Sequence, residues 1–508
     1  MAGAAMSSGW SVTITGEQWA ALHAHLFPGD EDEHGAVLRC GIARSERGNR
    51  LLVRDVIPAI DGTDYVAGDR GNRLLVRDVI PAIDGTDYVA GDRGYRKLTA
   101  EFVADNIDVC ADEGLAYLAV HNHGGHDKVA FSGTDMASHE RGYPALLDIN
   151  GGVPVGALVF ASGAVAGDIW LGGEERAPIA HLRVVGRSRL ELTPAPTAAA
   201  VADPRFDRQT RIFGDRGQQI LANSKVAIVG LGGAGSVLSE YVARLGVGEL
   251  VLIDPDRIDP TNLPRVVGAR RRDALAWLRH PTRLALIRAL GERFAAFKVN
   301  IAARVARQAS STIRITSVPR SVMEPDVAAL LTDCDHIFLA ADSALARRLV
   351  NSVSHQYLIP NTQIGAKVSV KDGEITDIFS VSRMSSPGSG CLQCNGLIPA
   401  WKLTVEATSP EQRKRQQYID DDDVHAPSVI TLNAVAASRA IDDWLMSVGG
   451  LVERDASADH WVSYHPRTGE VVEIEPVKDD GCLQCGPTRF ALGDGKELPV
   501  APASGNGG

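Results

Sequence analysis

A group of histidine, serine and acidic side chains early in the sequence has the composition of a hydrolytic metal site. His121 and His123 follow an apolar segment, and a strand there would place both imidazoles on one face. Asp135 would complete a three-ligand zinc set and leave the fourth position for water. Glu33 is the expected general base, and Ser132 is expected to stabilise an oxyanion.

A glycine-rich turn in the second half of the sequence has the spacing of a nucleotide-binding loop. It stands between an expected strand at 225–229 and an expected helix at 236–245, and its glycines are Gly230, Gly232, Gly233 and Gly235. Backbone amides at such a helix start bind phosphates, and the helix dipole assists them. The same spacing serves NAD enzymes, so the turn alone leaves the nucleotide open.

Polar side chains after this turn favour ATP over NAD. Asp254 ends the second expected strand, at 249–253, and is expected to bind ribose hydroxyls. The other residues expected to contact the nucleotide or its magnesium ion are Asp256, Asn262, Arg265, Lys298 and Asp342. Arginine and lysine suit a triphosphate, and a carboxylate suits Mg²⁺.

Four of the seven cysteines form two Cys-x-x-Cys pairs, Cys391 with Cys394 and Cys482 with Cys485. This pattern predicts a structural zinc ion held by four thiolates. The competing interpretation is that one of these cysteines forms a thioester with an activated protein. Cys40, Cys110 and Cys334 are expected to be small buried residues.

Composition restricts the classes of partner and compartment. The chain has 508 residues, 44% of them hydrophobic, and a net charge of −11. This balance argues against a nucleic-acid or anionic-membrane partner. The sequence shows neither a secretory leader nor an apolar run long enough for a bilayer, so a cytoplasmic protein is expected.

Two domains are expected on either side of a Pro/Ala-rich linker. The first has the pattern of an α+β domain and the second alternates strands and helices, which predicts an α/β domain with a mostly parallel sheet. The expected divisions are the first domain at 10–192, the linker at 193–204, the second domain at 205–490 and a disordered tail at 491–508.

A tandem duplication lies inside the first domain. Residues 48–70 recur without change as residues 71–93. Each copy contains an expected strand, 51–57 in the first and 74–80 in the second, that ends in a Pro and an Asp-Gly turn. The sequence does not decide which copy fills the native strand position.

The first site resembles the JAB/MPN (JAMM) family of zinc isopeptidases over residues 10–185. That family has a Glu, a His-x-His and a Ser-x-x-Asp in the order found here. Gly124-Gly125 stands where the family usually has Pro, and the His-to-Asp spacing is one residue longer. The resemblance implies a catalytic zinc ion and peptidase activity on an isopeptide or peptide bond.

Residues 205–490 resemble the ThiF/MoeB superfamily, which includes the catalytic core of ubiquitin-activating enzymes. The matching stretches are Arg208-Gln-Thr-Arg211, Val-Gly-Leu-Gly-Gly-Ala-Gly-Ser, Ala243-Arg-Leu-Gly-Val-Gly and Asn-Leu-x-Arg. The resemblance implies a Rossmann-like fold that adenylates the C-terminus of a ubiquitin-like or sulfur-carrier protein ending in a Gly-Gly type sequence. It also implies a homodimer, in which Arg211 reaches the partner subunit's site.

Three hypotheses of function follow from these two resemblances. The first is a bacterial-type ubiquitin-like conjugation enzyme that activates a modifier and cleaves it, with a conjugating-enzyme-like protein as a further partner. The second is activation and trimming of a sulfur carrier for biosynthetic sulfur transfer. In the third, the second domain adenylates, while the first is a docking module inactivated by the duplication.

Overall fold

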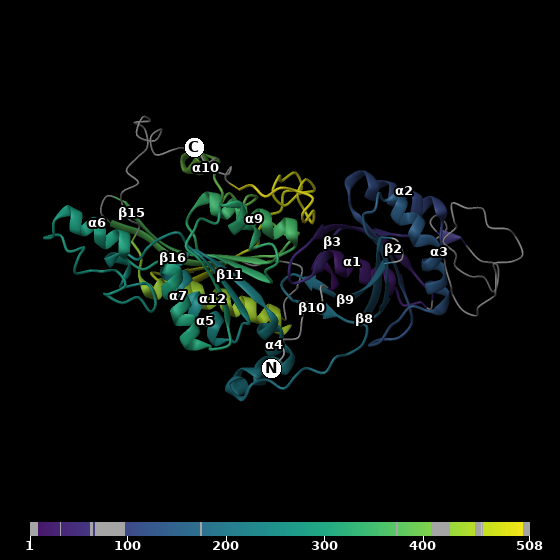
Figure 1. Ribbon diagram of the computed structural model, residues 1–508, viewed down its shortest axis with the longest axis horizontal. Helices are drawn as coiled ribbons and strands as arrows, with labels where there is room; N and C mark the ends of the chain where they lie inside the picture. The colour runs from purple at the N-terminus through teal and green to yellow at the C-terminus, as the bar shows by residue number, and fades with distance from the viewer. Residues whose placement is uncertain are drawn as a thin grey trace, which may run out of the picture. The chain divides into compact units, whose positions relative to one another are not determined.

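The computed structural model describes residues 9–30, 32–60, 65–66, 97–172, 175–371, 374–407, 427–452, 459 and 461–500 (Figure 1). The chain forms two compact units. Unit 1 comprises residues 1–185, 189–198 and 490–497, and unit 2 comprises residues 186–188, 199–489 and 498–508. The second copy of the repeat, residues 71–93, lies outside the described residues.

Unit 1 is built on a mixed sheet that closes on itself. Strand β1 (Trp10–Thr15) pairs with β3 (Asn49–Pro58) on one side and with β9 (Glu175–Val185) on the other. Between them the order continues through β2 (Gly35–Ala43), β6 (Ala116–Asn122), β7 (Val155–Ala161) and β8 (Ala164–Gly172), and β10 (Leu190–Leu192) joins β9. The helices are α1 (Gly16–Leu26), α2 (Ala100–Glu113) and α3 (Gly133–Ile149), and β4 (Tyr65–Val66) pairs separately with β5 (Lys97–Leu98).

The first copy of the repeat supplies a regular strand of this sheet. The expected strand at 51–57 lies within β3, which pairs with both β1 and β2. Leu51, Leu52 and Val53 of β3 are buried in the core. The duplication therefore leaves β2 in place between β3 and β6.

Part of the expected disordered tail instead completes the sheet of unit 1. Strand β6 pairs with β2 only as far as Cys40, which leaves the next residues of β2 open on that side. The C-terminal segment 490–497 lies there: Gly493 bridges to Ile42, and the Asp494 amide donates to the Ile42 carbonyl at 2.8 Å. Backbone hydrogen bonds to an unfilled strand edge hold these residues, an arrangement that composition alone could not reveal.

Gly41 is required for this close approach, because a Cβ added there would lie 2.0 Å from the Ala491 carbonyl oxygen. We expect Gly41→Ala to lower the stability of unit 1 by about 1–3 kcal/mol through overpacking. The matched control is Gly142→Ala in α3, where an added Cβ meets no atom within 4 Å. The helix propensity of alanine should make that change neutral or stabilising. Thermal unfolding of both variants measures the difference, and equal melting temperatures would contradict the packing described here.

Unit 2 contains an eight-stranded sheet of mixed direction. Its strands in spatial order are β13 (Arg314–Val318), β12 (Glu249–Ile253), β11 (Lys225–Val229), β14 (His336–Leu339), β15 (Asn361–Lys371), β16 (Glu374–Ser385), β17 (Trp461–His465) and β18 (Glu470–Ile474). The pairings are parallel from β13 to β15 and antiparallel from β15 to β18. The expected parallel sheet is thus only its first half, since a hairpin and a further antiparallel pair extend it.

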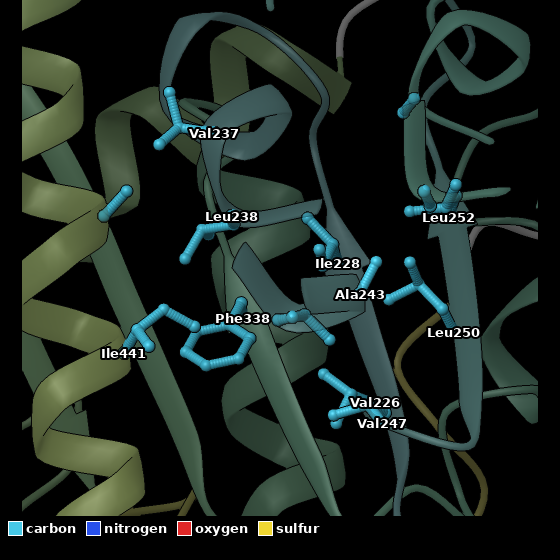
Figure 2. Close-up of a cluster of buried hydrophobic side chains, with 14 of the residues drawn as sticks. Val226, Ile228, Val237, Leu238, Ala243, Val247, Leu250, Leu252, Phe338 and Ile441 are labelled. Atoms are coloured by element: carbon cyan, nitrogen blue, oxygen red, sulfur yellow. The ribbon is translucent and has the colours of Figure 1, made fainter. Parts of the chain in front are cut away.

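Helices pack on this sheet through a core drawn from alternate strand positions. The helices are α4 (Asp207–Asn223), α5 (Gly233–Arg244), α6 (Ala285–Phe294), α7 (Lys298–Ala309), α8 (Pro325–Ala329), α9 (Ala344–Tyr357), α10 (Ala400–Ala407) and α12 (Ile430–Gly449). Figure 2 shows Val226 and Ile228 of β11 near Phe338 of β14, with Leu238 of α5 above Phe338 and Ile441 of α12 to the left of its ring. Residues two apart share a face of a strand, which explains the regular spacing of the buried side chains. No helix within the described ranges is both long and apolar enough to span a bilayer.

Candidate functional site

The two histidines and the aspartate expected to bind metal converge in unit 1. The Nε2 atoms of His121 and His123 lie 3.2 Å apart, and Asp135 Oδ2 lies 3.6 and 3.4 Å from them. A tetrahedral zinc ion with bonds of about 2.0–2.1 Å has ligand–ligand edges of about 3.4 Å. The three side chains therefore fit a single zinc ion.

Glu33 lies beside this group because of the strand register. Gly35 of β2 stands opposite His121 of β6, so the residues preceding β2 reach the histidines. Glu33 Oε1 is 3.9 Å from His123 Nε2, whereas Glu33 Oε2 is buried and has no hydrogen-bond partner among the described residues. Burial raises the pKa of Glu33 to about 7. A carboxyl with that pKa can both take up and release a proton near neutral pH.

Asn122 is a positioning residue of this site that the sequence analysis did not identify. It lies between the two histidines, with its side chain pointing to the other face of β6 and buried. Its side-chain Oδ1 accepts a hydrogen bond from the backbone amide of His34, and the backbone amide of Asn122 donates to the His34 carbonyl at 3.2 Å. These two bonds fix the backbone next to Glu33. Only the pairing of β2 with β6 makes this role visible.

Ser132 caps helix α3 and orients Asp135. Its Oγ accepts from the Asp135 amide at 3.1 Å, while the Ser132 amide donates to Asp135 Oδ2 at 2.7 Å. Burial would raise the pKa of Asp135, but its bonds to His121, His123 and Ser132 hold it below the usual value. The structure thus shows a capping role for Ser132, and the expected contact with an oxyanion stays a prediction.

The glycine turn of unit 2 connects the end of β11 to the start of α5 and lies against the residues that follow β14. Gly230 has φ of +92°, a conformation that favours glycine, and a Cβ there would lie 2.7 Å from the Ala341 amide nitrogen. A Cβ on Gly235 would lie 1.9 Å from the Gly230 carbonyl oxygen. Gly232 and Gly233 form the start of α5. The turn therefore presents backbone amides at a helix N-terminus, as phosphate binding requires.

Asp254 holds the turn to the next strand. Its carboxylate accepts hydrogen bonds from the Leu231 amide at 2.6 Å and from the Asp256 amide at 2.8 Å. Lys298 Nζ lies 2.7 Å from Asp256 Oδ2 and 3.8 Å from Asp254 Oδ1. Burial raises the pKa of Asp254, although Lys298 and the two amides oppose this effect. The structure brings Asp254, Asp256 and Lys298 together, as their expected common role requires.

The other expected nucleotide contacts occupy more varied positions. Arg265 is half-buried, and its Cδ lies 3.5 Å from the position of a Cβ on Gly233. Asn262 Oδ1 accepts from the Asp259 amide, which gives it a local structural role. Asp342 is exposed after β14. Arg211 is exposed and pairs with Asp207 at 2.9 Å, so its expected role in a partner subunit stays a prediction.

The sequence did not reveal two residues, Asn433 beside the glycine turn and Glu406 at the start of α9. Asn433 of α12 is buried, and its Nδ2 would lie 2.1 Å from a Cβ on Gly233. Glu406 of α10 accepts hydrogen bonds from the Ala344 and Leu345 amides at the start of α9, both at 2.9 Å. Neither residue belongs to a local motif, because each contacts its site from a helix much further along the chain.

The four paired cysteines form one cluster in unit 2. Each Sγ atom lies within 4.8 Å of the other three, and the separations between Cys391 and Cys394 and between Cys394 and Cys485 are both 3.5 Å. Tetrahedral zinc with bonds of about 2.3 Å places sulfurs about 3.8 Å apart. A hydrogen bond from Cys485 lowers the pKa of Cys391, which favours the thiolate form that binds metal. The thiols therefore fit a zinc ion.

Removal of either set of ligands should remove one metal ion. We expect the purified chain to contain about two equivalents of zinc, because both sets have zinc ligand types and spacing. Changing Cys391 and Cys394 to serine should leave about one equivalent, and changing His121 and His123 to alanine should remove the other. Elemental analysis measures the content. An unchanged content after the histidine changes would argue against metal at that site.

The fold and site of unit 2 define a nucleotide-binding α/β domain, and comparisons with known proteins assign its family. Residues 206–483 match the model of the ThiF family. The molybdopterin-synthase adenylyltransferase of Escherichia coli K12 is 27% identical over 286 residues, which cover 56% of this chain and 96% of that protein. The chain belongs to the ThiF family, and its C-terminal part is an adenylyltransferase domain of that family.

Other relatives match shorter stretches. The adenylyltransferase and sulfurtransferase MOCS3 of Mus musculus is 32% identical over 161 residues, or 31% of each chain. The tRNA threonylcarbamoyladenosine dehydratase of Bacillus subtilis 168 is 43% identical over 65 residues, so the chain spans 26% of that protein. A solved structure, E. coli MccB with ATP, is 20% identical, with a TM-score of 0.41 over 56% of this chain and 75% of that one.

Proposed function

We propose that unit 2 adenylates the C-terminal carboxylate of a small protein with a Gly-Gly type ending. The observation that carries this proposal is the turn from Gly230 to Gly235, fixed by Asp254 and lined by Lys298 and Arg265, in a ThiF-family domain. A carboxylate oxygen of the partner attacks the α-phosphorus of ATP. The bond to pyrophosphate breaks, and a protein acyl-adenylate forms.

The charged residues have distinct proposed tasks in this reaction. The backbone amides of the turn and the side chains of Lys298 and Arg265 bind the phosphates, which carry most of the charge. Asp254 would contact the ribose hydroxyls and Asp342 would bind the magnesium ion, while Asp256 and Asn262 would contact the nucleotide. Magnesium supplies charge neutralisation on the phosphates when it is bound.

ATP–pyrophosphate exchange tests the adenylation step. Exchange should require a ubiquitin-fold protein ending in Gly-Gly and should vanish when that dipeptide is removed. Asp254→Asn replaces a charged carboxylate that accepts hydrogen bonds from two backbone amides, so kcat/KM for ATP should fall by about ten- to hundredfold. The control is Asp326→Asn, an exposed aspartate paired with Arg320, which should leave exchange unchanged. Lack of exchange with every such partner would overturn the proposal.

Unit 1 supports a second activity, hydrolysis of a peptide or isopeptide bond. The specific observation is a buried Glu33 with an unpaired Oε2 beside three side chains that fit zinc. Zinc bound there supplies Lewis-acid activation of water when it is present. Glu33 would take a proton from water and deliver it to the leaving amine, and Asn122 would hold Glu33 in position. The intact β2 favours this reading over a docking module inactivated by the duplication.

Glu33→Gln should abolish cleavage while zinc content stays unchanged, because the amide cannot accept the proton. We expect a fall of at least about a hundredfold in the cleavage rate of a fusion extended beyond Gly-Gly. Glu101→Gln on the exposed face of α2 is the matched control and should cleave normally. Wild-type chain that binds zinc but cleaves neither this fusion nor a Gly-Gly isopeptide would favour the docking module.

The fate of the adenylate separates conjugation from sulfur transfer. Both pathways share the activation step, and the names of two relatives, a molybdopterin-synthase adenylyltransferase and an adenylyltransferase and sulfurtransferase, favour a sulfur carrier as the partner. Mass spectrometry of the partner after reaction distinguishes a thiocarboxylate from an isopeptide-linked product. A covalent adduct with one of the four clustered cysteines would instead support a thioester step.

A further inference from the structure

Helix α6 presents an apolar surface that the described residues of unit 2 leave uncovered. Leu286, Leu290 and Phe294 recur every fourth residue and are 75%, 45% and 66% exposed. Residues four apart lie on one face of a helix, so these side chains form a continuous stripe. Figure 1 shows α6 at an outer edge of unit 2, away from α5, α7 and α12. We call Leu286, Leu290 and Phe294 the α6 stripe.

The surroundings of the α6 stripe are strongly basic. Residues 265–296 contain eight arginines and two acidic residues, in a chain whose net charge is −11. Arg283, Arg288 and Arg293 are exposed and form no ion pair within the described part of the chain. At 3.6 residues per turn, Arg293 flanks the α6 stripe, whereas Arg288 lies on the opposite side of the helix, and Arg283 precedes the helix. An apolar stripe flanked by an unpaired arginine in a basic segment is suited to a partner with an apolar patch and acidic residues around it.

The segment that carries α6 is tied at both ends to the nucleotide site. Before the helix, Arg279 donates to the Ile258 carbonyl at 3.1 Å and pairs with Asp259. After it, Arg257 lies over Phe297, and the Lys298 amide donates to the Asp256 carbonyl at 3.0 Å. A protein docked on α6 would therefore be held next to the residues proposed to bind ATP.

We infer that the α6 stripe and its arginines form the docking surface for the folded body of the protein whose C-terminus unit 2 adenylates. This inference rests on the proposed function and adds the chemistry of the partner, an apolar patch with an acidic rim. Docking would raise the local concentration of the C-terminal tail at the nucleotide site.

A second copy of this chain and an anionic membrane would each suit the charges around the α6 stripe less well than such a protein. Pairing of α6 with α6 of a second copy would bring the like-charged Arg293 side chains of both copies together, because a two-fold interface repeats the same patch. An anionic membrane would attract the arginines but repel the chain as a whole at its net charge of −11. A protein partner would contact only the α6 stripe and the arginines near it. The negative net charge of the chain would therefore repel such a partner less than it would repel a membrane.

The test compares a whole partner with its tail alone. The probes are the Gly-Gly-ending ubiquitin-fold protein that supports exchange in the wild type, and a peptide of its last ten residues. We expect Leu290→Ala/Phe294→Ala, and separately Arg293→Glu, to raise the KM for the whole protein by about tenfold or more. The KM for the peptide and the KM for ATP should stay unchanged.

Matched controls are equally exposed residues elsewhere in unit 2. Val471→Ala/Ile474→Ala on β18 controls for the loss of apolar surface, and Arg307→Glu on α7 controls for the charge change. Unchanged KM for the whole protein in the α6 variants overturns the docking surface while leaving adenylation intact. Absence of exchange in the wild type removes both proposals. A different outcome is that the α6 variants keep the wild-type KM for the whole protein but show a lower oligomeric mass, or lose binding to phosphatidylserine vesicles. Either result would identify a second copy or a membrane as the occupant of the α6 stripe and would also overturn the proposed docking surface.

Discussion

The buried carboxylate of Asp254 is the contact on which the geometry of unit 2 depends. Asp254 directly follows β12, and its carboxylate accepts hydrogen bonds from the backbone amide of Leu231 in the glycine turn and from that of Asp256 beyond the strand. One side chain thus fixes the turn after β11 to the loop after β12. Lys298 partly offsets the charge of this buried group, which links α7 to the same point. The expected phosphate and ribose contacts share one edge of the sheet because of this link.

In unit 1 the corresponding constraint is the register between β2 and β6. The proposed ligands His121 and His123 are two residues apart in sequence, but Glu33 reaches them only because Gly35 stands opposite His121. A shift of one residue would turn every side chain of β2 to the other face of the sheet. The reciprocal bonds between His34 and Asn122 hold this register next to the site. The first repeat copy in β3 supports β2 from its other side.

The functions of the two units rest on different observations. The adenylyltransferase domain is assigned by its family, and its partner is open to experiment. The proposed hydrolytic site rests on geometry: three ligands at zinc spacing with an unpaired carboxylate oxygen beside them. If both proposals hold, one chain activates a C-terminus and cleaves bonds next to such an end. The α6 stripe would then give unit 2 a means to select the protein it activates.

The sequence by itself determined the features whose physical cause is local. The alternation of β6 places His121 and His123 together, the glycine spacing produces the turn at the start of α5, and the strands that carry both motifs are where their apolar residues predict. The clustering of two cysteine pairs was also predicted, because thiolate pairs of this spacing have few other uses.

Only the tertiary structure decided which distant residues complete these sites. Asn433 and Glu406 reach the nucleotide edge from late helices, and Cys391 meets Cys482 across 91 residues. The segment expected to be a disordered tail binds the open edge of β2, and an antiparallel half extends the sheet of unit 2. Such contacts depend on strand register and on close approach between elements, which no residue encodes alone, so sequence pattern could not reveal them.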